Sequence, residues 1–327
     1  MKVLVTGAAG FIGHHVARRL AETRRCEVLG VDNLSDYYDV ALKRARLEQL
    51  APLEDFRFLQ ADFADAAKFP ALVAHFKPDY VVHLGAQPGV RFSMEQPAAY
   101  TRNNLEGFAT VLEACRRNPP RHLVFASSSS VYGAGAKPPF REDDDANRPV
   151  SYYGATKRAN ELMAYRYAHN QRLNVTGLRF FTVYGPWGRP DMALFLFTRN
   201  ILEGKPIDVF NHGRHRRDFT YVDDIVEGIL RTLDRPAVPN PAFDATHPDP
   251  GTSSAPWRVY NIGNSRPVEL LDYIAAIERC TGRKATMNLL PLQPGDVPDT
   301  MADVEALERD TGYRPSTTVE TGIARFI

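Results

Sequence analysis

The sequence has few cysteines, no long hydrophobic run and almost no net charge. Its three cysteines, Cys26, Cys115 and Cys280, are odd in number, far apart and in no metal-ligating spacing, which is typical of reduced thiols and gives no reason to expect a metal. The apolar run after Met1 is too short for a signal peptide or a membrane span. The formal net charge is +1, and no basic run is interleaved with aromatic residues. We therefore expect a cytoplasmic protein with neither a membrane nor a nucleic-acid partner.

The order of hydrophobic segments indicates the fold class. In the first half, short β-rich runs alternate with stretches whose apolar residues recur at helical spacing. This alternation predicts a doubly wound, Rossmann-type α/β fold, in which helices cover both faces of a parallel sheet. The predicted strands are residues 3–5, 27–31, 56–59, 80–84 and 122–126, and the predicted helices follow Ile12 and span 105–115.

The second half loses this regularity. Residues 235–257 are rich in proline and serine and have no periodicity, which predicts a long surface loop. After it we expect a strand at 259–262, an amphipathic helix at 268–280 and a further helix at 304–311. We expect residues 1–181 to form the Rossmann-type domain, with returning segments near 217–235 and 257–265. The rest of 182–327 then forms a smaller, mixed α/β domain.

Three glycines, Gly7, Gly10 and Gly13, lie between the first predicted strand and helix. This GxxGxxG spacing permits a tight turn and a close approach of a dinucleotide pyrophosphate, which the helix N-terminus then binds. Asp32 ends the second strand, where a carboxylate accepts hydrogen bonds from ribose hydroxyls and repels a 2′-phosphate. The loop alone is also typical of an ordinary turn, but with Asp32 it predicts NAD rather than NADP.

Tyr153 and Lys157 are four residues apart on a predicted helix, so the Lys157 ammonium can stand near the Tyr153 hydroxyl. A neighbouring cation lowers the pKa of a phenol from its usual value near ~10, so that it can act as a general base. The serines at 127–130 follow the strand that ends at Ala126, at the edge where open parallel sheets bind ligands. Each pattern alone is common on helix surfaces or loops; together with the glycine turn they predict a redox site.

These motifs resemble those of the extended short-chain dehydrogenase/reductases, and within them the UDP-glucuronate 4-epimerases. The resemblance runs along the whole chain, although Gly85 stands where alanine is usual. The segments that carry it, besides the glycine turn, are 31–34 with 36–38, 85–91, 126–133, 153–157, 179–192, 217–224 and 293–298.

The resemblance implies a catalytic triad and a cofactor site. Tyr153 would be the catalytic base, Lys157 would lower its pKa and hold the nicotinamide ribose, and Ser128 would be the hydroxyl of the triad. The implied NAD-binding residues are Gly7, Gly10, Phe11, Ile12, Gly13, Asp32, Asn33, Asp62, Phe63, Leu84, Ala86, Gln87, Asn103, Tyr153, Lys157 and Phe181.

The resemblance also implies a UDP-sugar site. Arg217 would bind the pyrophosphate, Asp296 the ribose, and Val209 and Phe210 would lie along the uracil. Oxidation of a uronate at C4″ creates a β-keto acid, whose carboxylate must be held out of line with the ketone if carbon dioxide is not to be lost. The candidate hydroxyl donors are Ser127, Ser129 and Thr182, beside Ser128 and Tyr153. The candidate charge partners are Arg91 and Arg189, each of which could instead be structural.

The implied activity is a reversible, NAD-dependent conversion of UDP-glucuronate to UDP-galacturonate through a transient 4-keto sugar. Ser129 and Ser130 stand where related 4,6-dehydratases carry Asp-Glu, which argues against dehydration, and Thr182 stands where galactose-type epimerases carry Asn. A UDP-uronate decarboxylase, an epimerase of another nucleotide sugar and a non-catalytic NAD-binding scaffold remain as alternatives. By the same resemblance we expect a homodimer, formed through the helices near 105–115 and 155–167.

Overall fold

The computed structural model describes residues 1–24, 26–133, 135–293 and 296–327. Pro294 and Gly295 of the 293–298 segment lie outside these ranges. Within the described ranges, no helix combines the length and the apolar character that crossing a membrane requires.

The larger part of the molecule is a seven-stranded, all-parallel sheet in the order β10-β6-β5-β4-β1-β2-β3. The inner strands are apolar and buried on both faces, as expected where helices cover both sides. The chain runs outward from β1 in one direction and returns at β4 on the other side, so a topological switch point lies between β1 and β4. The Rossmann-type α/β fold is confirmed. Its strands are β1 (Lys2–Thr6), β2 (Glu27–Asp32), β3 (Phe56–Gln60), β4 (Tyr80–His83), β5 (His122–Ser128), β6 (Val175–Phe180) and β10 (Trp257–Ile262).

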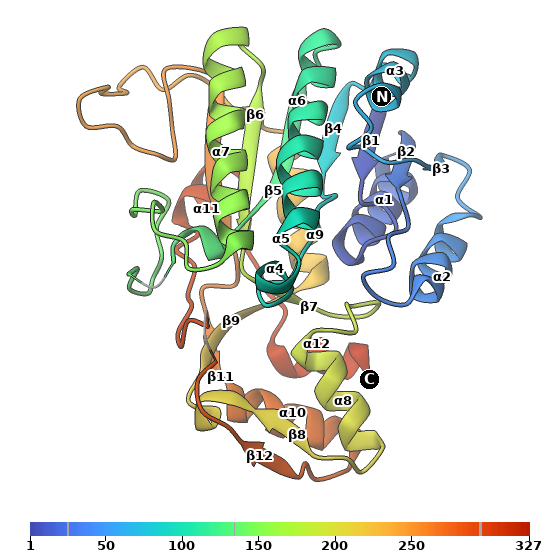
Figure 1. Ribbon diagram of the computed structural model, residues 1–327, viewed down its shortest axis with the longest axis vertical. Coiled ribbons are helices and arrows are strands. Elements are labelled where there is room, and N and C mark those ends of the chain that lie inside the picture. The colour runs from blue at the N-terminus through green and yellow to red at the C-terminus, as the bar shows by residue number, and fades with distance from the viewer. Residues whose placement is uncertain (25, 134, 294–295) are drawn as a thin grey trace.

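Helices pack on both faces of this sheet. α3, α6 and α7 form one layer, in which α6 and α7 stand side by side (Figure 1), and α1 and α9 pack together on the other face. The short helix η2 directly follows β5, and the short helices α4 and α5 lead through the π-helix η1 into α6. The helices of this part are α1 (Phe11–Arg24), α2 (Val40–Leu50), α3 (Lys68–Phe76), α4 (Phe92–Glu95), α5 (Pro97–Tyr100), η1 (Thr101–Glu106), α6 (Gly107–Arg117), η2 (Ser129–Val131), α7 (Tyr152–Gln171) and α9 (Val222–Leu233).

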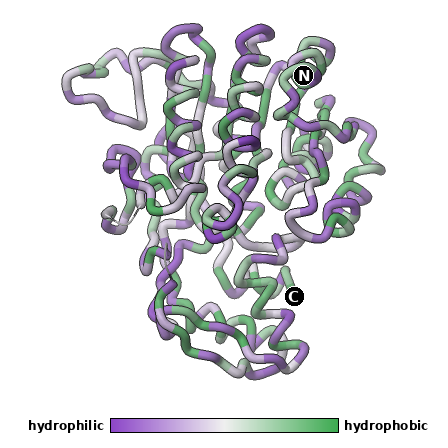
Figure 2. The backbone as a smooth tube through the Cα atoms, viewed as in Figure 1, coloured by the Kyte–Doolittle hydropathy of each residue, from purple (hydrophilic) through white to green (hydrophobic). Residues whose placement is uncertain are grey.

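The smaller part lies beyond the carboxyl ends of the sheet strands, in the lower half of Figure 1. It contains a three-stranded sheet, β11-β9-β7, and a two-stranded sheet, β12-β8. α8 and α10 are rich in apolar residues, which are green in Figure 2. The two helices pack against each other. Its elements are β7 (Thr182–Tyr184), α8 (Ala193–Leu202), β8 (Ile207–Val209), η3 (Phe210–Gly213), β9 (Arg216–Tyr221), β11 (Pro267–Glu269), α10 (Leu270–Thr281), β12 (Met287–Leu289) and α12 (Val319–Phe326). α11 (Glu305–Thr311) returns to the larger part, where it packs against β10 and α9.

The structure differs from the sequence predictions mainly in this second half. The helix expected from residue 268 begins at Leu270, because Val268 belongs to β11 and pairs with Arg217 of β9. The helix expected over 105–115 begins inside a π-helix and runs on to Arg117. The loop predicted after α9 is confirmed, since residues 236–256 contain neither helix nor strand.

Candidate functional site

The glycine turn joins β1 to α1 with almost no space for side chains. Gly7 has a φ of +72°, and a Cβ atom there would lie 2.8 Å from the backbone nitrogen of Gly85. A Cβ atom on Gly13 would lie 2.0 Å from the Gly7 carbonyl oxygen. The turn closes through the Gly10 N–H, which donates to that same carbonyl at 2.9 Å. Backbone N–H groups at the start of α1 are thus brought together over bare backbone, and such a cradle fits a pyrophosphate.

Asp32 lies at the end of β2, beside this turn. Its carboxylate accepts hydrogen bonds from the Leu34 N–H at 2.8 Å and the Ala9 N–H at 3.2 Å. The buried ammonium of Lys43 lies 3.8 Å from Asp32 and donates to the Ser35 hydroxyl at 3.0 Å. Burial lowers the pKa of Lys43, although Asp32 opposes this effect. Sequence reasoning missed Lys43, since a lysine in a helix gives no signal of its burial.

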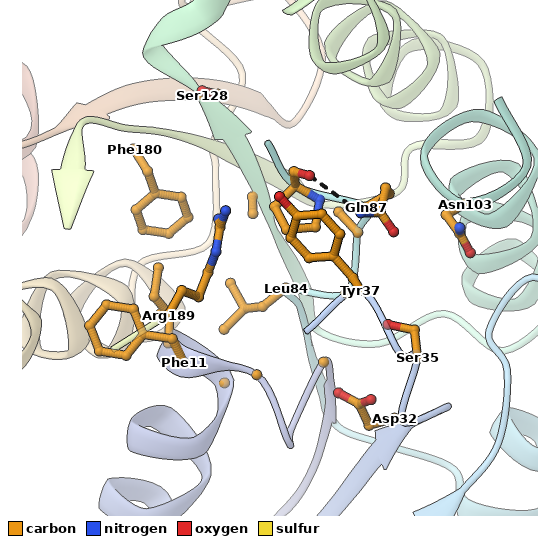
Figure 3. Close-up of a pocket in the computed structure, with 18 of the residues that line it drawn as sticks. Phe11, Asp32, Ser35, Tyr37, Leu84, Gln87, Asn103, Ser128, Phe180 and Arg189 are labelled. Atoms are coloured by element: carbon orange, nitrogen blue, oxygen red, sulfur yellow. Dashed lines mark hydrogen bonds between the residues drawn. The ribbon is translucent and has the colours of Figure 1, made fainter. Parts of the chain in front are cut away.

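A cavity of about 240 Å³ extends from Asp32 to Ser128, which lie at opposite ends of it in Figure 3. It brings together most of the residues implied at the NAD site. These are Gly7, Gly10, Phe11, Ile12, Gly13, Asp32, Asn33, Phe63, Leu84, Ala86, Gln87, Asn103, Tyr153, Lys157 and Phe181, and Ser128 of the implied triad lines the same cavity. Asp62 does not line it; its carboxylate is paired with Arg102 at 2.6 Å. Further lining residues to which the sequence assigned no role are Ser35, Tyr37, Tyr38, Lys43, Phe180 and Val183.

Tyr153 and Lys157 share one face of α7, as predicted, but their electrostatics differ from the prediction. The Lys157 ammonium donates to the Ala126 carbonyl at 2.8 Å and lies 5.9 Å from the centre of the Tyr153 ring. Burial lowers the pKa of Lys157 to about 8. Burial also raises the pKa of Tyr153, while the Ser128 hydroxyl and the charge of Arg189 lower it. In the protein alone, burial therefore outweighs the cations around Tyr153.

Tyr37 and Arg189 lie over the middle of the cavity (Figure 3). The Tyr37 hydroxyl donates to Asp191 at 3.0 Å, and Arg189 Nε donates to the same carboxylate at 3.0 Å. Burial, followed by the charge of Asp191, raises the pKa of Tyr37 to about 12. A neutral tyrosine from the loop after β2 thus bridges to the loop after β7.

A second cavity, of about 200 Å³, lies beside the first. It brings together Ser129, Thr182, Arg217 and Asp296, four of the residues implied at the UDP-sugar site, and also Ser130. Arg217 Nη1 donates to the Pro298 carbonyl at 2.7 Å. Burial lowers the pKa of Arg217, and Asp296 and Asp299 oppose this effect. Ser128 and Ser129, consecutive in the chain, line the first and the second cavity respectively.

The remaining implied sugar-site residues lie at the rim or behind it. The Arg91 guanidinium lies 3.5 Å from Asp296 and 4.9 Å from the centre of the Phe210 ring. Val209 is fully buried in β8. Ser127 lines the first cavity, and its buried hydroxyl donates to Glu161 at 2.6 Å.

Comparisons with known proteins identify the family of this chain. The model of the NAD-dependent epimerase/dehydratase family matches residues 3–246. A probable UDP-glucuronate 4-epimerase of Rhizobium meliloti (strain 1021) is 46% identical over 331 residues, covering 100% of this chain and 96% of the relative. UDP-glucuronate 4-epimerase 2 of Arabidopsis thaliana is 46% identical over 332 residues, covering 100% and 75%. The structure of UDP-glucuronic acid 4-epimerase from Bacillus cereus with UDP-glucuronic acid and NAD superposes with a TM-score of 0.88 at 33% identity, covering 100% of this chain and 98% of that one.

Proposed function

The chain belongs to the NAD-dependent epimerase/dehydratase family, and from this premise we propose that it is an isomerase that interconverts UDP-glucuronate and UDP-galacturonate with bound NAD. One observation carries the proposal. Tyr153 and Ser128 line the same cavity as the glycine turn, and Arg217 and Asp296 line the cavity beside it, which supports a dinucleotide and a nucleotide sugar bound side by side. The named activities of the relatives and of the superposed structure support the same substrate.

We assign NAD to the cleft that runs from the glycine turn to Lys157. The bare backbone around Gly7 and Gly13 fits a pyrophosphate, and Asp32 stands where ribose hydroxyls need an acceptor. We further propose that residues 1–181, with α9 and β10, form the NAD-binding unit, and that the rest of 182–327 forms the sugar-binding unit. When bound, NAD would supply the acceptor and donor of the C4″ hydride and, in its oxidised form, an additional positive charge in the cavity that Tyr153 lines.

Tyr153 would remove the proton of the C4″ hydroxyl, and Ser128 would relay it. Arg189 and Ser128 already oppose the effect of burial on the pKa of Tyr153, so additional positive charge shifts it toward the phenolate. Lys157 would hold ribose hydroxyls with the donors that the Ala126 carbonyl leaves free. After oxidation the 4-keto sugar would turn within the site. Tyr153 would return the proton when the other face of the sugar is reduced.

The second cavity would hold the rest of the substrate. Arg217, held by the Pro298 carbonyl, offers its guanidinium to the pyrophosphate, and Asp296 accepts from the ribose. The uronate carboxylate would meet the hydroxyls of Ser129, Ser130 and Thr182, which line one wall. These donors hold a carboxylate without supplying a strong acid, which is the condition for epimerisation rather than loss of carbon dioxide.

A homodimer and a cytoplasmic location complete the proposal. α6 and α7 pack side by side on one face of the molecule, and α7 exposes Leu162 there. A second copy would cover this pair. Sedimentation of the purified chain should give twice its 36.6 kDa mass, and a monomer at micromolar concentration would exclude the dimer.

The test of the activity is incubation of the purified protein with UDP-glucuronate and no added NAD, followed by proton NMR of the sugar. We expect UDP-galacturonate of unchanged mass. A UDP-pentose and carbon dioxide would identify a decarboxylase, and a different set of ring couplings an epimerase of another centre. No turnover of any UDP-sugar would support a non-catalytic scaffold.

A further inference from the structure

The buried carboxylate of Glu161 on α7 is held between one serine and two arginines. The Ser127 hydroxyl donates to Glu161 Oε1 at 2.6 Å, and Arg179 donates to both carboxylate oxygens at 2.9 and 3.0 Å. Arg158 donates to Oε2 at 2.8 Å. Burial alone would raise the pKa of Glu161, but Arg179, Ser127 and Arg158 hold that pKa below its usual value. The carboxylate is therefore ionised, with both oxygens occupied.

The Glu161 cluster lies next to the end of β5 that carries Ser128. Tyr153, Lys157 and Glu161 recur every four residues and so share one face of α7. Lys157 donates to the Ala126 carbonyl, and Glu161 accepts from the side chain of Ser127. α7 is thus hydrogen-bonded to Ala126 and Ser127, the two residues of β5 that immediately precede Ser128. Since successive side chains of a strand point to opposite faces, an anchored Ser127 also orients Ser128.

The far side of the cluster is equally fixed. Arg179, which has no exposed surface, also donates to the Tyr132 hydroxyl at 2.9 Å, and Tyr132 donates to Asn261 Oδ1 at 2.7 Å. The hydrogen bond between Glu161 and Ser127 is therefore connected through Arg179 of β6 to Asn261 of β10. A buried ion pair of this kind contributes little net stability compared with apolar packing, and one established use of such pairs is to fix a specific geometry.

We propose that Glu161 is a positioning residue: by accepting a hydrogen bond from the Ser127 hydroxyl it fixes the end of β5 and so sets the position of the Ser128 hydroxyl relative to Tyr153. This inference rests on the proposed oxidation at C4″ for the role of Tyr153. In this proposal Ser127 has a structural role, and Ser129, Ser130 and Thr182 bind the sugar carboxylate.

The proposal predicts a pH signature. The groups that face Tyr153 are Ser128 from β5, Lys157 from α7, Arg189 from the loop after β7, and Tyr100 from α5, whose ring lies 6.2 Å away. Of these, the Ser128 hydroxyl and Arg189 lower the pKa of Tyr153. A misplaced Ser128 therefore raises that pKa, and the phenolate forms only at higher pH.

The experiment compares Ser127→Ala with the matched variant Ser129→Ala, one residue on either side of Ser128. Ser127→Ala keeps the Glu161–Arg179 pair and should fold and retain NAD. We expect its kcat at neutral pH to fall about ten- to a hundredfold, its KM to stay within about twofold, and the acidic limb of its kcat–pH profile to move upward. Ser129→Ala should instead raise KM for the uronate and leave that limb in place.

A second variant tests the hydrogen bond between Ser127 and Glu161 directly. Glu161→Asp keeps the charge for Arg179 but withdraws the carboxylate from Ser127, so it should reproduce the Ser127→Ala profile. Because both changes break one contact, the double variant should lose no more than either single variant.

Three results would overturn the proposal: a raised KM with unchanged kcat in Ser127→Ala, a kcat and pH profile within twofold of the wild type, or losses that multiply in the double variant. Kinetics are compared on whichever UDP-sugar the wild type converts. If the wild type does not convert UDP-glucuronate, the proposed substrate is wrong. The role of Glu161 is still tested by comparing the variants on the UDP-sugar that the wild type does convert.

Discussion

The two cavities lie side by side but are built in different ways. The cofactor cavity is formed mainly by the carboxyl ends of neighbouring strands and the turns that directly follow them, such as the glycine turn after β1 and Asp32 at the end of β2, together with residues of α7 and of the loop after β7. The substrate cavity is formed by segments far apart in the chain, which meet through contacts such as Arg91 with Asp296, 205 residues apart. The first thus depends on local backbone geometry and the second on the docking of loops. Changes in one should leave the other largely intact.

The largest expected effect comes from Tyr153→Phe, which removes the base where the two cavities meet. We expect kcat to fall by about 10²–10⁴-fold, while copurified NAD stays at the wild-type level because the glycine turn is unchanged. Tyr152→Phe is the matched control, since its hydroxyl contacts Thr101 at the surface. Near-normal turnover of Tyr153→Phe would remove the mechanism.

Arg217→Ala should affect the substrate cavity alone. Losing charge-assisted hydrogen bonds to the pyrophosphate costs about 1.5–3 kcal/mol, so KM should rise about ten- to a hundredfold with a smaller change in kcat. The neighbouring Arg216, which is 46% exposed and lies 3.7 Å from Asp299, provides the control variant Arg216→Ala. An unchanged KM, or a loss of bound NAD, would break the separation of the two cavities.

Acid should destabilise the protein through the buried histidines of its larger part. His14, His83 and His122 are buried on α1, β4 and β5, and burial lowers their pKa values to about 3, 3 and 4. The unfolded chain takes up protons below about pH 6.5 and the folded chain does not, so each histidine costs about 2 kcal/mol of unfolding free energy by about pH 5.

His14→Leu tests this directly, because both ring nitrogens of His14 are buried without a partner among the described residues. Urea unfolding should show that its stability falls about 2 kcal/mol less between neutral pH and about pH 5 than that of the wild type. The surface variant His75→Gln should keep the wild-type slope. Equal slopes in all three proteins would show that the buried histidine does not contribute.

The smallest effect should come from Tyr37→Phe, which removes the hydrogen bond to Asp191 over the cofactor cavity. One such bond is worth about 0.5–1.5 kcal/mol, so NAD should dissociate about two- to tenfold faster, as measured by dilution into an NAD scavenger. Tyr167→Phe, whose hydroxyl lies 3.5 Å from Glu113, is the control. Unchanged release would show that the Tyr37–Asp191 bridge does not retain the cofactor.

The same contrast explains how much of the site could be predicted from sequence. The glycine turn, Asp32 and the Tyr153–Lys157 pair depend on spacing within one strand-turn-helix or one helix, and the structure places all of them on one cavity. Glu161 carried a partial signal, since it continues the four-residue spacing of Tyr153 and Lys157. Its function depends on Ser127 and Arg179, which only the folded chain brings into contact.

Residues that meet across long separations carried no signal. Tyr37 and Asp191 are 154 residues apart, and nothing in either segment indicates their hydrogen bond. The short strands β8 and β12 likewise become recognisable only when they pair with each other. The lowered pKa expected for Tyr153 was wrong for the protein alone, because the sequence shows the spacing of Lys157 but not the burial of both groups.

The central claim is that the hydrogen taken from C4″ returns to the same carbon of the same sugar. The most direct test is to convert UDP-glucuronate deuterated at C4″ in ordinary water and to read the product by NMR and mass spectrometry. We expect UDP-galacturonate that retains its deuterium at C4″, with none exchanged for solvent hydrogen. Loss of the deuterium to solvent, or a product lighter by carbon dioxide, would contradict it.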